Sequence, residues 1–382
     1  MSLKVLWITS TFPENANSAR HLYLWDSLHA LKQAGIDSIV LHTPSWKPCA
    51  SEAVDKSQFP VEINTRSCFS IPRHYFRSIS NAAYCACVVP KIKKLHRLHQ
   101  FDVIHAHGEI SGLAAVIAAK QLSIASVVTI HGIDMSPRMW KGGAHSRFKN
   151  MFNQVDKLIF VGESLQQHFE PMLDNRARSC VVYNGVRLPS SAIIDPHIIQ
   201  SPVQIISVSN LHEGKGIDIT LQALANLKNK GHDNWMYTII GSGDQKAAFL
   251  EIIKKYNLHN HVEFKGDLSH DVVYENLQKA DIFCLPSYRE AFGIAYLEAM
   301  VHGLLTIGVS GQGPQAFIEH GKTGLLVEPR NVDSLTNTLL QTLENREKMQ
   351  DIAEAGKQSV VENFTWSKHA DRLIAVYKEV CS

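Results

Sequence analysis

Short apolar runs alternate with helix-length amphipathic segments along the whole chain of 382 residues. In the first half, this pattern predicts strands at Val5–Ile8, Ser38–Leu41, Val103–Ala106, Val127–Ile130, Leu158–Val161 and Cys180–Tyr183. In the second half, it predicts strands at Val203–Val208, Met236–Ile240, Val262–Phe264, Ile282–Leu285, Leu305–Val309 and Leu325–Val327. The helices expected between them include Ser18–Gln33, Ser111–Gln121, Ile217–Lys228, Asp244–Lys255 and Ala291–His302. Such alternation is typical of parallel α/β folds.

The length of the chain predicts two domains, because single hydrophobic cores stop growing at about 250–300 residues. The alternating pattern pauses at 188–200, a stretch rich in Pro, Ser and isolated Ile that is typical of a linker. We therefore expect a first domain at 1–187, a second at 201–363, and a last helical segment at 364–382. Two doubly wound domains facing each other across a cleft would bind ligands beyond the carboxyl ends of their strands.

The composition is that of an ordinary globular protein, with 45% apolar and 19% charged residues. No apolar run reaches the roughly 18–20 residues that span a bilayer, and we interpret the apolar start as a core strand instead of a signal peptide. Seven cysteines are scattered without a Cys-x-x-Cys pair, which favours reduced thiols and a cytoplasmic location.

The charge is unevenly distributed between the two halves. Residues 1–190 carry 21 basic and 13 acidic side chains, whereas residues 191–382 carry 17 and 23. Residues 63–101 contain no acidic residue but seven basic ones: Arg66, Arg73, Arg77, Lys91, Lys93, Lys94 and Arg97. This segment predicts either an anionic partner, such as a membrane surface or a lipid phosphate, or simply a solvated basic helix face. Nucleic acid is not favoured, because no motif for it is present.

The most informative motif is Leu285–Met300, with the sequence LPSYREAFGIAYLEAM. It predicts a buried strand, a turn, Glu290 in the following loop, and a helix that opens with Phe292-Gly293-Ile294. The first turn of that helix offers free N–H groups and partial positive charge to an anion or a polar ligand. Glu298 lies about two turns further along and would reach another part of an extended ligand.

Glycine-rich loops follow three of the predicted strands in the second half. The stretch Val208–Asp218 contains Gly214 and Lys215 close to a helix start. A cation at this position suits a diphosphate whose negative charge grows as a sugar leaves it. Gly241 and Gly243 follow the next strand, but Lys246 occupies the third glycine position of a dinucleotide fingerprint. We therefore expect a tight turn there, and the segment around Gly321-Lys322-Thr323 likewise lacks the glycine that a P-loop requires at position 316. The third loop, after 305–309, includes Gln315.

Histidines follow two predicted strands of the first half, in Asp102–Gly108 and Thr129–Asp134. His107 and His131 would both lie at the carboxyl edge of the sheet. Three histidines, His105, His107 and His131, could supply nitrogens to a metal, but no Asp or Glu completes a convincing set, so we expect no metal site. The alternative interpretation is that these histidines are buried and have a structural role, above all His105.

These motifs resemble the glycosyltransferase family 4 enzymes and their GT-B relatives, whose motif of two Glu separated by seven residues matches Glu290 and Glu298. The resemblance covers nearly the whole chain. It implies that Glu290 contacts the donor sugar, aided by the N–H groups of Phe292, Gly293 and Ile294, and that Glu298 binds the ribose hydroxyls. It further implies that Lys215, with Gly214, binds the diphosphate, that Gly241 and Gly243 line the donor site, and that His131 lies near the reacting sugar, with His107 nearby.

The chain departs from the family pattern at two positions. Asn210 stands where an Arg usually binds the diphosphate beside the Lys, so one of the two cations of that interaction is absent at this position. Gln315 stands where relatives often have Glu, and its neutral amide would alter which donor is accepted. On the acceptor side, the loop after the first strand carries Asn17 and Ser18, where relatives tend to have glycines. The resemblance also implies that the last helix packs back on the first domain.

The resemblance implies a retaining, metal-independent transfer of a hexose-type sugar from a UDP- or GDP-type donor, with no other cofactor. The proposed chemistry is a front-face displacement in which the leaving phosphate helps to deprotonate the incoming hydroxyl. The basic segment 63–101 favours a lipid-linked or polysaccharide acceptor at the inner face of a membrane. Two alternatives are a sugar-nucleotide epimerase, for which Glu109 is the only well-placed additional carboxylate, and a non-catalytic sugar- or membrane-binding member.

Overall fold

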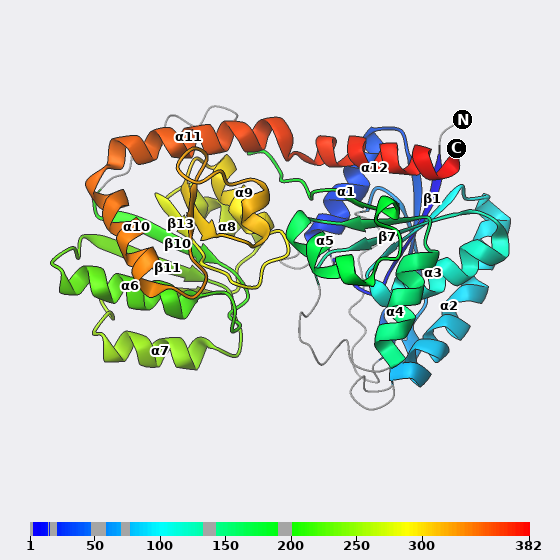
Figure 1. The fold of residues 1–382 in the computed structure, drawn as a ribbon, viewed down its shortest axis with the longest axis horizontal. Coiled ribbons are helices and arrows are strands. Elements are labelled where there is room, and N and C mark those ends of the chain that lie inside the picture. The colour runs from blue at the N-terminus through cyan, green and yellow to red at the C-terminus, as the bar shows by residue number, and fades with distance from the viewer. Residues whose placement is uncertain are drawn as a thin grey trace. The chain divides into compact units, whose positions relative to one another are not determined.

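Each half of the chain folds around its own parallel sheet. The computed structural model describes residues 3–13, 15, 21–46, 59–69, 77–132, 143–189 and 201–382. The chain divides into unit 1, formed by residues 1–185 together with 366–382, and unit 2, formed by residues 186–365. The two units are described separately, and Figure 1 labels many of their elements.

Unit 1 contains a seven-stranded sheet in the order β4-β2-β1-β6-β7-β8-β9, in which all neighbours pair in parallel. Its strands are β1 Lys4–Thr9, β2 Asp37–His42, β4 Glu62–Thr65, β6 Val103–His107, β7 Ala125–Ile130, β8 Lys157–Phe160 and β9 Ser179–Val181. A separate pair joins β3 (Ser45–Trp46) to β5 (Cys68–Phe69). The strand order reverses at β1 and β6, and in such sheets ligands bind at this point.

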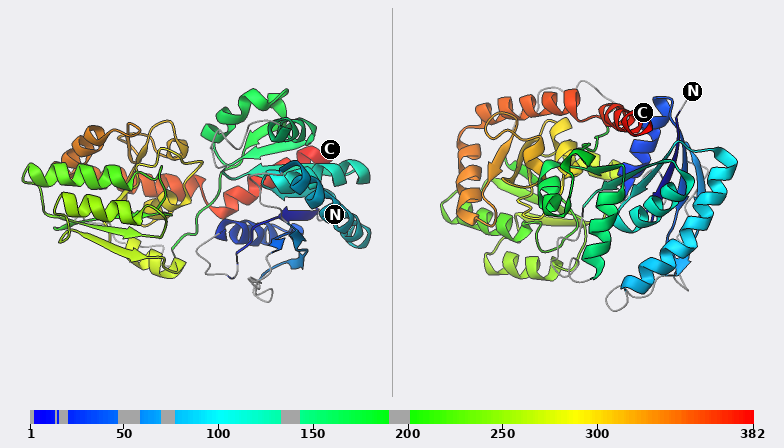
Figure 2. Two further views of the ribbon diagram at one scale, coloured as in Figure 1. Left: turned by 90° about the horizontal axis from the view of Figure 1, so that it is seen from below. Right: turned by 45° about the vertical axis from the view of Figure 1, so that its right-hand side comes forward.

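The helices of unit 1 cover both faces of its sheet. They are α1 Leu22–Gln33, α2 Arg77–His99, α3 Glu109–Leu122, α4 Gly143–Gln154, α5 Glu163–Phe169 and α12 Trp366–Cys381, with short 3₁₀ turns at Glu170–Met172 and Arg176–Arg178. On one face, Val5 and Trp7 pack in a core with apolar residues of α1 and α12. On the other face, α3 packs against β6 and β7 between α2 and α4. Figure 2 shows α12 beside α1, although the two helices are separated by most of the chain.

Unit 2 contains a six-stranded parallel sheet in the order β12-β11-β10-β13-β14-β15. The strands are β10 Val203–Val208, β11 Trp235–Ile240, β12 Val262–Gly266, β13 Ile282–Cys284, β14 Leu305–Val309 and β15 Leu325–Val327. The helices are α6 Ile217–Asn229, α7 Lys246–Lys255, α8 His270–Leu277, α9 Ile294–Val301, α10 Val332–Glu344 and α11 Arg346–Asn363, with a 3₁₀ turn at Gly313–Ala316. Here the strand order reverses between β10 and β13, and the loops that follow these strands therefore lie at the expected ligand position.

The predicted α/β fold with two Rossmann-like units is confirmed, and the differences concern element ends and three short strands. The helix predicted from Ala291 begins at Ile294, because Gly293 takes a left-handed conformation with φ +95° as its N-cap. The helix predicted from Asp244 begins at Lys246. Strands β3, β4 and β5 were missing from the prediction, since they are short and lack a clear alternating pattern. Most of the predicted linker, residues 190–200, lies outside the described residues.

None of the helices within the described ranges combines the length and apolarity needed to cross a bilayer.

Candidate functional site

Four loops meet at the carboxyl edge of the unit 2 sheet, after β10, β11, β13 and β14. The loop after β10 is tied to the loop after β11, because the N–H of Leu211 donates to the carbonyl of Ser242 at 2.8 Å. It is also tied to the loop after β13, where the N–H of Tyr288 donates to the carbonyl of Gly214 at 2.9 Å. The N–H of Gly313, after β14, donates to the carbonyl of Glu290 at 2.9 Å. These bonds make the loops one connected surface.

Several glycines permit this close packing. A side chain at Gly241 would place its Cβ 1.9 Å from the carbonyl oxygen of Ser209, and one at Gly243 would lie 2.3 Å from that of Leu211. At Gly216 the same atom would lie 2.2 Å from the carbonyl oxygen of Pro286. The backbone of the loops therefore fits together only where side chains are absent.

Lys215 and Glu290 form an ion pair at the centre of this surface. The Nζ of Lys215 donates to Oε2 of Glu290 at 2.8 Å, and the side chains are 24% and 14% exposed. The N–H of Glu290 donates to Oε1 of Gln312 at 3.2 Å, which fixes the backbone that carries the carboxylate. The cation and the carboxylate thus stand together, still partly open to solvent.

The N-terminus of α9 begins four residues after Glu290. Gly293 caps the helix, and a Cβ on it would lie 2.6 Å from the buried ring of Tyr296. Phe292 is buried and packs edge-on against Phe317. The N–H groups of a first helical turn have no carbonyl partner within the helix, so the start of α9 at Ile294 offers donors and partial positive charge.

Glu298 lies on α9 and is hydrogen-bonded by a residue that the sequence did not single out. Nε2 of His270, the first residue of α8, lies 2.8 Å from Oε1 of Glu298, and both side chains are 13% exposed. The ring of His270 also packs on Tyr274. One carboxylate oxygen of Glu298 is therefore oriented by His270.

Asn210 and Gln315, the two residues that differ from the family pattern, have different surroundings. Asn210 is exposed in the loop after β10, where its carbonyl accepts from the N–H of His212. Gln315 is tied into its own loop, because its Oε1 accepts from the N–H of Gly311 at 2.6 Å. Neither residue carries a charge.

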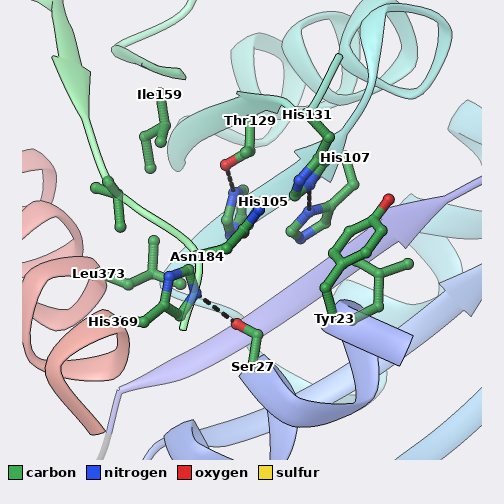
Figure 3. A pocket seen from close by; sticks show the side chains of 12 residues that line it. Tyr23, Ser27, His105, His107, Thr129, His131, Ile159, Asn184, His369 and Leu373 are labelled. Carbon is green, nitrogen blue, oxygen red and sulfur yellow. Dashed lines mark hydrogen bonds between the residues drawn. The ribbon is translucent and has the colours of Figure 1, made fainter. Parts of the chain in front are cut away.

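A second group of polar residues gathers in unit 1, around the ends of β6 and β7 (Figure 3). Nδ1 of His107 lies 2.8 Å from Nε2 of His131, and the two rings stack at an angle of 18°. The second nitrogen of each ring, Nε2 of His107 and Nδ1 of His131, has no hydrogen-bond partner among the described residues. In either arrangement of the shared proton, this pair presents one free donor and one free acceptor.

A cavity of about 10 Å³ lies beside this pair, room for about one water molecule. It is lined by Tyr23, Leu24, Ser27, His105, His107, Thr129, His131, Ile159, Val182, Asn184, His369 and Leu373. Burial lowers the pKa of His131 to about 3 and holds the pKa of His107 well below its ordinary value. Both imidazoles are therefore neutral at neutral pH.

His105 is held on both sides by the protein. The indole N–H of Trp7 donates to the hydroxyl of Tyr377 at 3.2 Å, so the hydroxyl proton is free to donate to Nδ1 of His105 at 2.7 Å. The protonated Nε2 then donates to Oγ1 of Thr129 at 2.7 Å. This network gives His105 a structural role and leaves neither of its nitrogens for a metal.

The described residues contain no group of three His, Cys, Asp or Glu side chains able to hold a metal ion. Glu109 begins α3, directly after Gly108, and is half-buried. Asn17 and Ser18 lie outside the described residues.

The structure adds residues to both groups that sequence reasoning missed. His270 follows the end of β12, so the rule that ligand-binding residues follow strands would have identified it. His369 comes from α12, where its Nδ1 donates to the carbonyl of Tyr183 and its Nε2 lies 2.7 Å from Oγ of Ser27. No local pattern links these segments, because 186 residues separate His369 from Tyr183.

The fold and both groups of residues define a two-unit α/β protein of the GT-B type. Two family models match the chain: Glycosyltransferase Family 4 over residues 22–188, and Glycosyl transferases group 1 over residues 193–359. Together the matched ranges span most of the chain, and it belongs to the family 4-like glycosyltransferases.

Characterised relatives and solved structures agree with this assignment. The glycogen synthase of Mycobacterium tuberculosis is 28% identical over 75% of this chain and 71% of its own length. The N-acetyl-alpha-D-glucosaminyl L-malate synthase of Bacillus anthracis is 24% identical over 84% of this chain and 83% of its own. The structure of Anabaena HepE in complex with UDP has a TM-score of 0.79 at 18% identity, covering 99% of this chain and all of the other. Sucrose-phosphate synthase from Thermosynechococcus elongatus has a TM-score of 0.77 at 17% identity, covering 99% and 98%.

Proposed function

We propose that this protein transfers a hexose-type sugar, with retention of configuration, from a UDP- or GDP-linked donor to a hydroxyl of a glycan. The observation that carries the proposal is the ion pair of Lys215 and Glu290 beside the N-terminus of α9. It places a cation, helix N–H groups and a carboxylate at the strand-order reversal of unit 2. The solved structures of HepE with UDP-glucose and TarM with UDP, which share the fold, support a nucleotide-linked donor.

In the proposed arrangement, unit 2 binds the donor. Lys215 and the first turn of α9 stabilise the diphosphate, whose negative charge grows as the bond from the sugar C1 to the phosphate oxygen breaks. Glu290 accepts hydrogen bonds from the donor sugar, and Glu298, oriented by His270, accepts them from the ribose hydroxyls. We assign no covalent role to Glu290, because Lys215 neutralises its carboxylate in the ion pair.

The acceptor hydroxyl forms its new bond to C1 on the face from which the nucleotide leaves, and its proton passes to the departing phosphate. No metal ion takes part in this proposal. His131 of unit 1 is neutral and hydrogen-bonded to His107, and the donor and the acceptor that this pair leaves unpaired are buried. A neutral imidazole also avoids repulsion with the positive charge that develops on the sugar.

We further propose that the acceptor is lipid-linked or a polysaccharide precursor, reached at the inner face of a membrane. The support is α2, which carries Lys91, Lys93, Lys94 and Arg97 without an acidic residue. Leu98 on the same helix is 67% exposed and Ile79 is 57% exposed, so apolar and basic groups share its surface. This combination suits an anionic bilayer.

The proposal is tested by screening sugar nucleotides for nucleotide release with and without glycan acceptors, and by determining the anomeric configuration of the product by NMR. Glu290→Gln and Lys215→Met should each lower turnover by about a hundredfold or more, because each removes an interaction that strengthens in the transition state. Lys322→Met serves as the control, since Lys322 is an exposed lysine of unit 2 paired with Glu319.

Near-normal turnover in Glu290→Gln or Lys215→Met, with folding verified by circular dichroism, would contradict these assignments. Conversion of the donor sugar to an epimer without net nucleotide release would identify an epimerase. Binding of sugar nucleotides without any turnover would identify a non-catalytic member.

A further inference from the structure

Arg289 lies against the loop that carries Lys215. The ideal Cβ position of Gly214 is 3.2 Å from Cδ of Arg289 and 3.4 Å from its Cβ and Cγ, so the aliphatic part of Arg289 runs along the Gly214 backbone. Gly214 has φ +104° and no side chain, which leaves the room that Arg289 occupies. The neighbouring bond from Tyr288 N–H to the Gly214 carbonyl fixes this placement.

Among the residues that the structure describes, none provides a counter-ion for the guanidinium of Arg289. The side chain is exposed, and no hydrogen bond or ion pair between described residues uses it. By contrast, Lys215 is paired with Glu290, and Arg330 lies over the ring of Tyr288 at 4.2 Å from its centroid. Lys215 and Arg289 are the two basic residues, Lys or Arg, in the four loops of this surface, which are residues 209–216, 241–245, 286–293 and 311–315.

The local charge balance calls for a second cation. The charges of Lys215 and Glu290 cancel, whereas a nucleoside diphosphate brings at least two negative charges to the same place. Asn210, at the position where relatives carry an Arg, adds none. An arginine can supply two parallel N–H donors to phosphate oxygens, which suits it to this role better than an amide.

We propose that Arg289 supplies the second cation for the diphosphate, together with Lys215, and so replaces the arginine that is absent at Asn210. This inference rests on the proposed function of the unit 2 surface. The diphosphate is held between two loops that are already bonded to each other, the one after β10 through Lys215 and the one after β13 through Arg289.

Calorimetric titration of UDP, GDP and the corresponding monophosphates into the full chain tests the proposal. We expect Arg289→Ala to weaken binding of the better diphosphate by about tenfold to a hundredfold, the range of charge-assisted hydrogen bonds. Binding of the monophosphate should change less, and Arg289→Lys should restore part of the loss. The salt dependence of diphosphate binding should become flatter in Arg289→Ala, because one exposed charge has been removed.

Arg346→Ala is the matched control, because Arg346 is a half-buried arginine of unit 2, outside these loops, that donates to Oγ of Ser201. Thermal unfolding of each variant separates a binding defect from a folding defect, and Arg289→Lys provides a conservative second test. If the unsubstituted chain binds UDP or GDP and Arg289→Ala binds it equally well, the inference about Arg289 is wrong while the proposed function stands. If the unsubstituted chain binds no nucleoside diphosphate, both are overturned.

Discussion

Gly216 and Gly321 show how the surroundings of a residue decide its importance. Both have left-handed backbones, with φ of +73° and +76°. Beside Gly216, however, a Cβ would lie 2.2 Å from the carbonyl oxygen of Pro286, whereas nothing lies within 4 Å of the same atom at Gly321. Gly216 therefore controls how closely the Lys215 loop approaches the loop that carries Glu290.

Gly216→Ala should lower turnover by at least tenfold and destabilise unit 2 by more than about 2 kcal/mol, since a steric clash adds to the cost of a left-handed conformation. Gly321→Ala should lower the free energy of unfolding by about 1 kcal/mol, because this alanine adopts a left-handed backbone without a steric clash. Circular dichroism during chemical unfolding and a nucleotide-release assay measure the two effects. Equal losses in both variants would show that the packing against Pro286 is unimportant.

At the scale of elements, α2 and α12 have different tasks. Helix α2 buries Val88, Ile92 and Leu95 against unit 1 and presents basic residues and the exposed Leu98 on its surface. Helix α12 instead buries an apolar stripe and places His369 and Tyr377 against other segments of unit 1. Helix α2 thus carries the basic surface on which the membrane proposal rests, whereas α12 completes a core.

Changing Lys91, Lys93 and Lys94 together to Gln should reduce binding to vesicles containing anionic phosphatidylglycerol by about a hundredfold, since each basic residue near such a surface contributes about 1 kcal/mol. Vesicle co-sedimentation measures the effect, with uncharged phosphatidylcholine vesicles as reference. Replacing Lys246, Lys254 and Lys255 of α7 with Gln provides the matched control. Unchanged binding in the α2 variant would remove the membrane proposal.

The buried histidines of unit 1 should make its stability depend on pH. Burial lowers the pKa of His369 to about 4, whereas an unfolded chain titrates near 6.5. Between these values the unfolded state binds more protons, so stability is lost as the pH falls from 6.5 towards 4, by about 3 kcal/mol for this residue. His131, with a pKa of about 3, and His105 and His107, whose pKa values are also lowered, act in the same direction.

Urea unfolding at pH 7, 6 and 5 measures this pH dependence of the unfolding free energy. Tryptophan fluorescence monitors the unfolding, because five of the six tryptophans belong to unit 1. In His369→Gln the decline in unfolding free energy towards pH 5 should be shallower, since one titrating group is gone. The same change at His168, an exposed histidine of unit 1, is the control. A decline as steep in His369→Gln as in the unsubstituted chain would contradict the assignment.

At the scale of the whole molecule, unit 1 combines residues 1–185 with the distant segment 366–382. Five residues of α12 belong to the core of that unit: Trp366, Ala370, Leu373, Val376 and Tyr377. Burial of large apolar side chains contributes about 1.5–3 kcal/mol each, so together they approach the 5–15 kcal/mol by which most domains are stable. Unit 2 contains no residue of this segment.

Ending the chain at Thr365 should therefore abolish cooperative unfolding of unit 1, monitored by tryptophan fluorescence, and leave the unfolding of unit 2 by circular dichroism nearly unchanged. Removing only Cys381 and Ser382, which are exposed, is the control and should leave both transitions in place. A cooperative fluorescence transition in the chain that ends at Thr365 would show that α12 is dispensable for unit 1.

The sequence by itself determined the α/β class, two Rossmann-like units and the family, because apolar periodicity and the spacing of Glu290 and Glu298 are local features. It also predicted which loops gather at the unit 2 surface, since parallel strands end at a common edge. Only the tertiary structure decided which partners these residues have: His270 for Glu298, Arg289 beside Gly214, and His369 beside Ser27 and Tyr183. Such contacts join residues far apart in the chain, and they depend on packing geometry that no local pattern encodes.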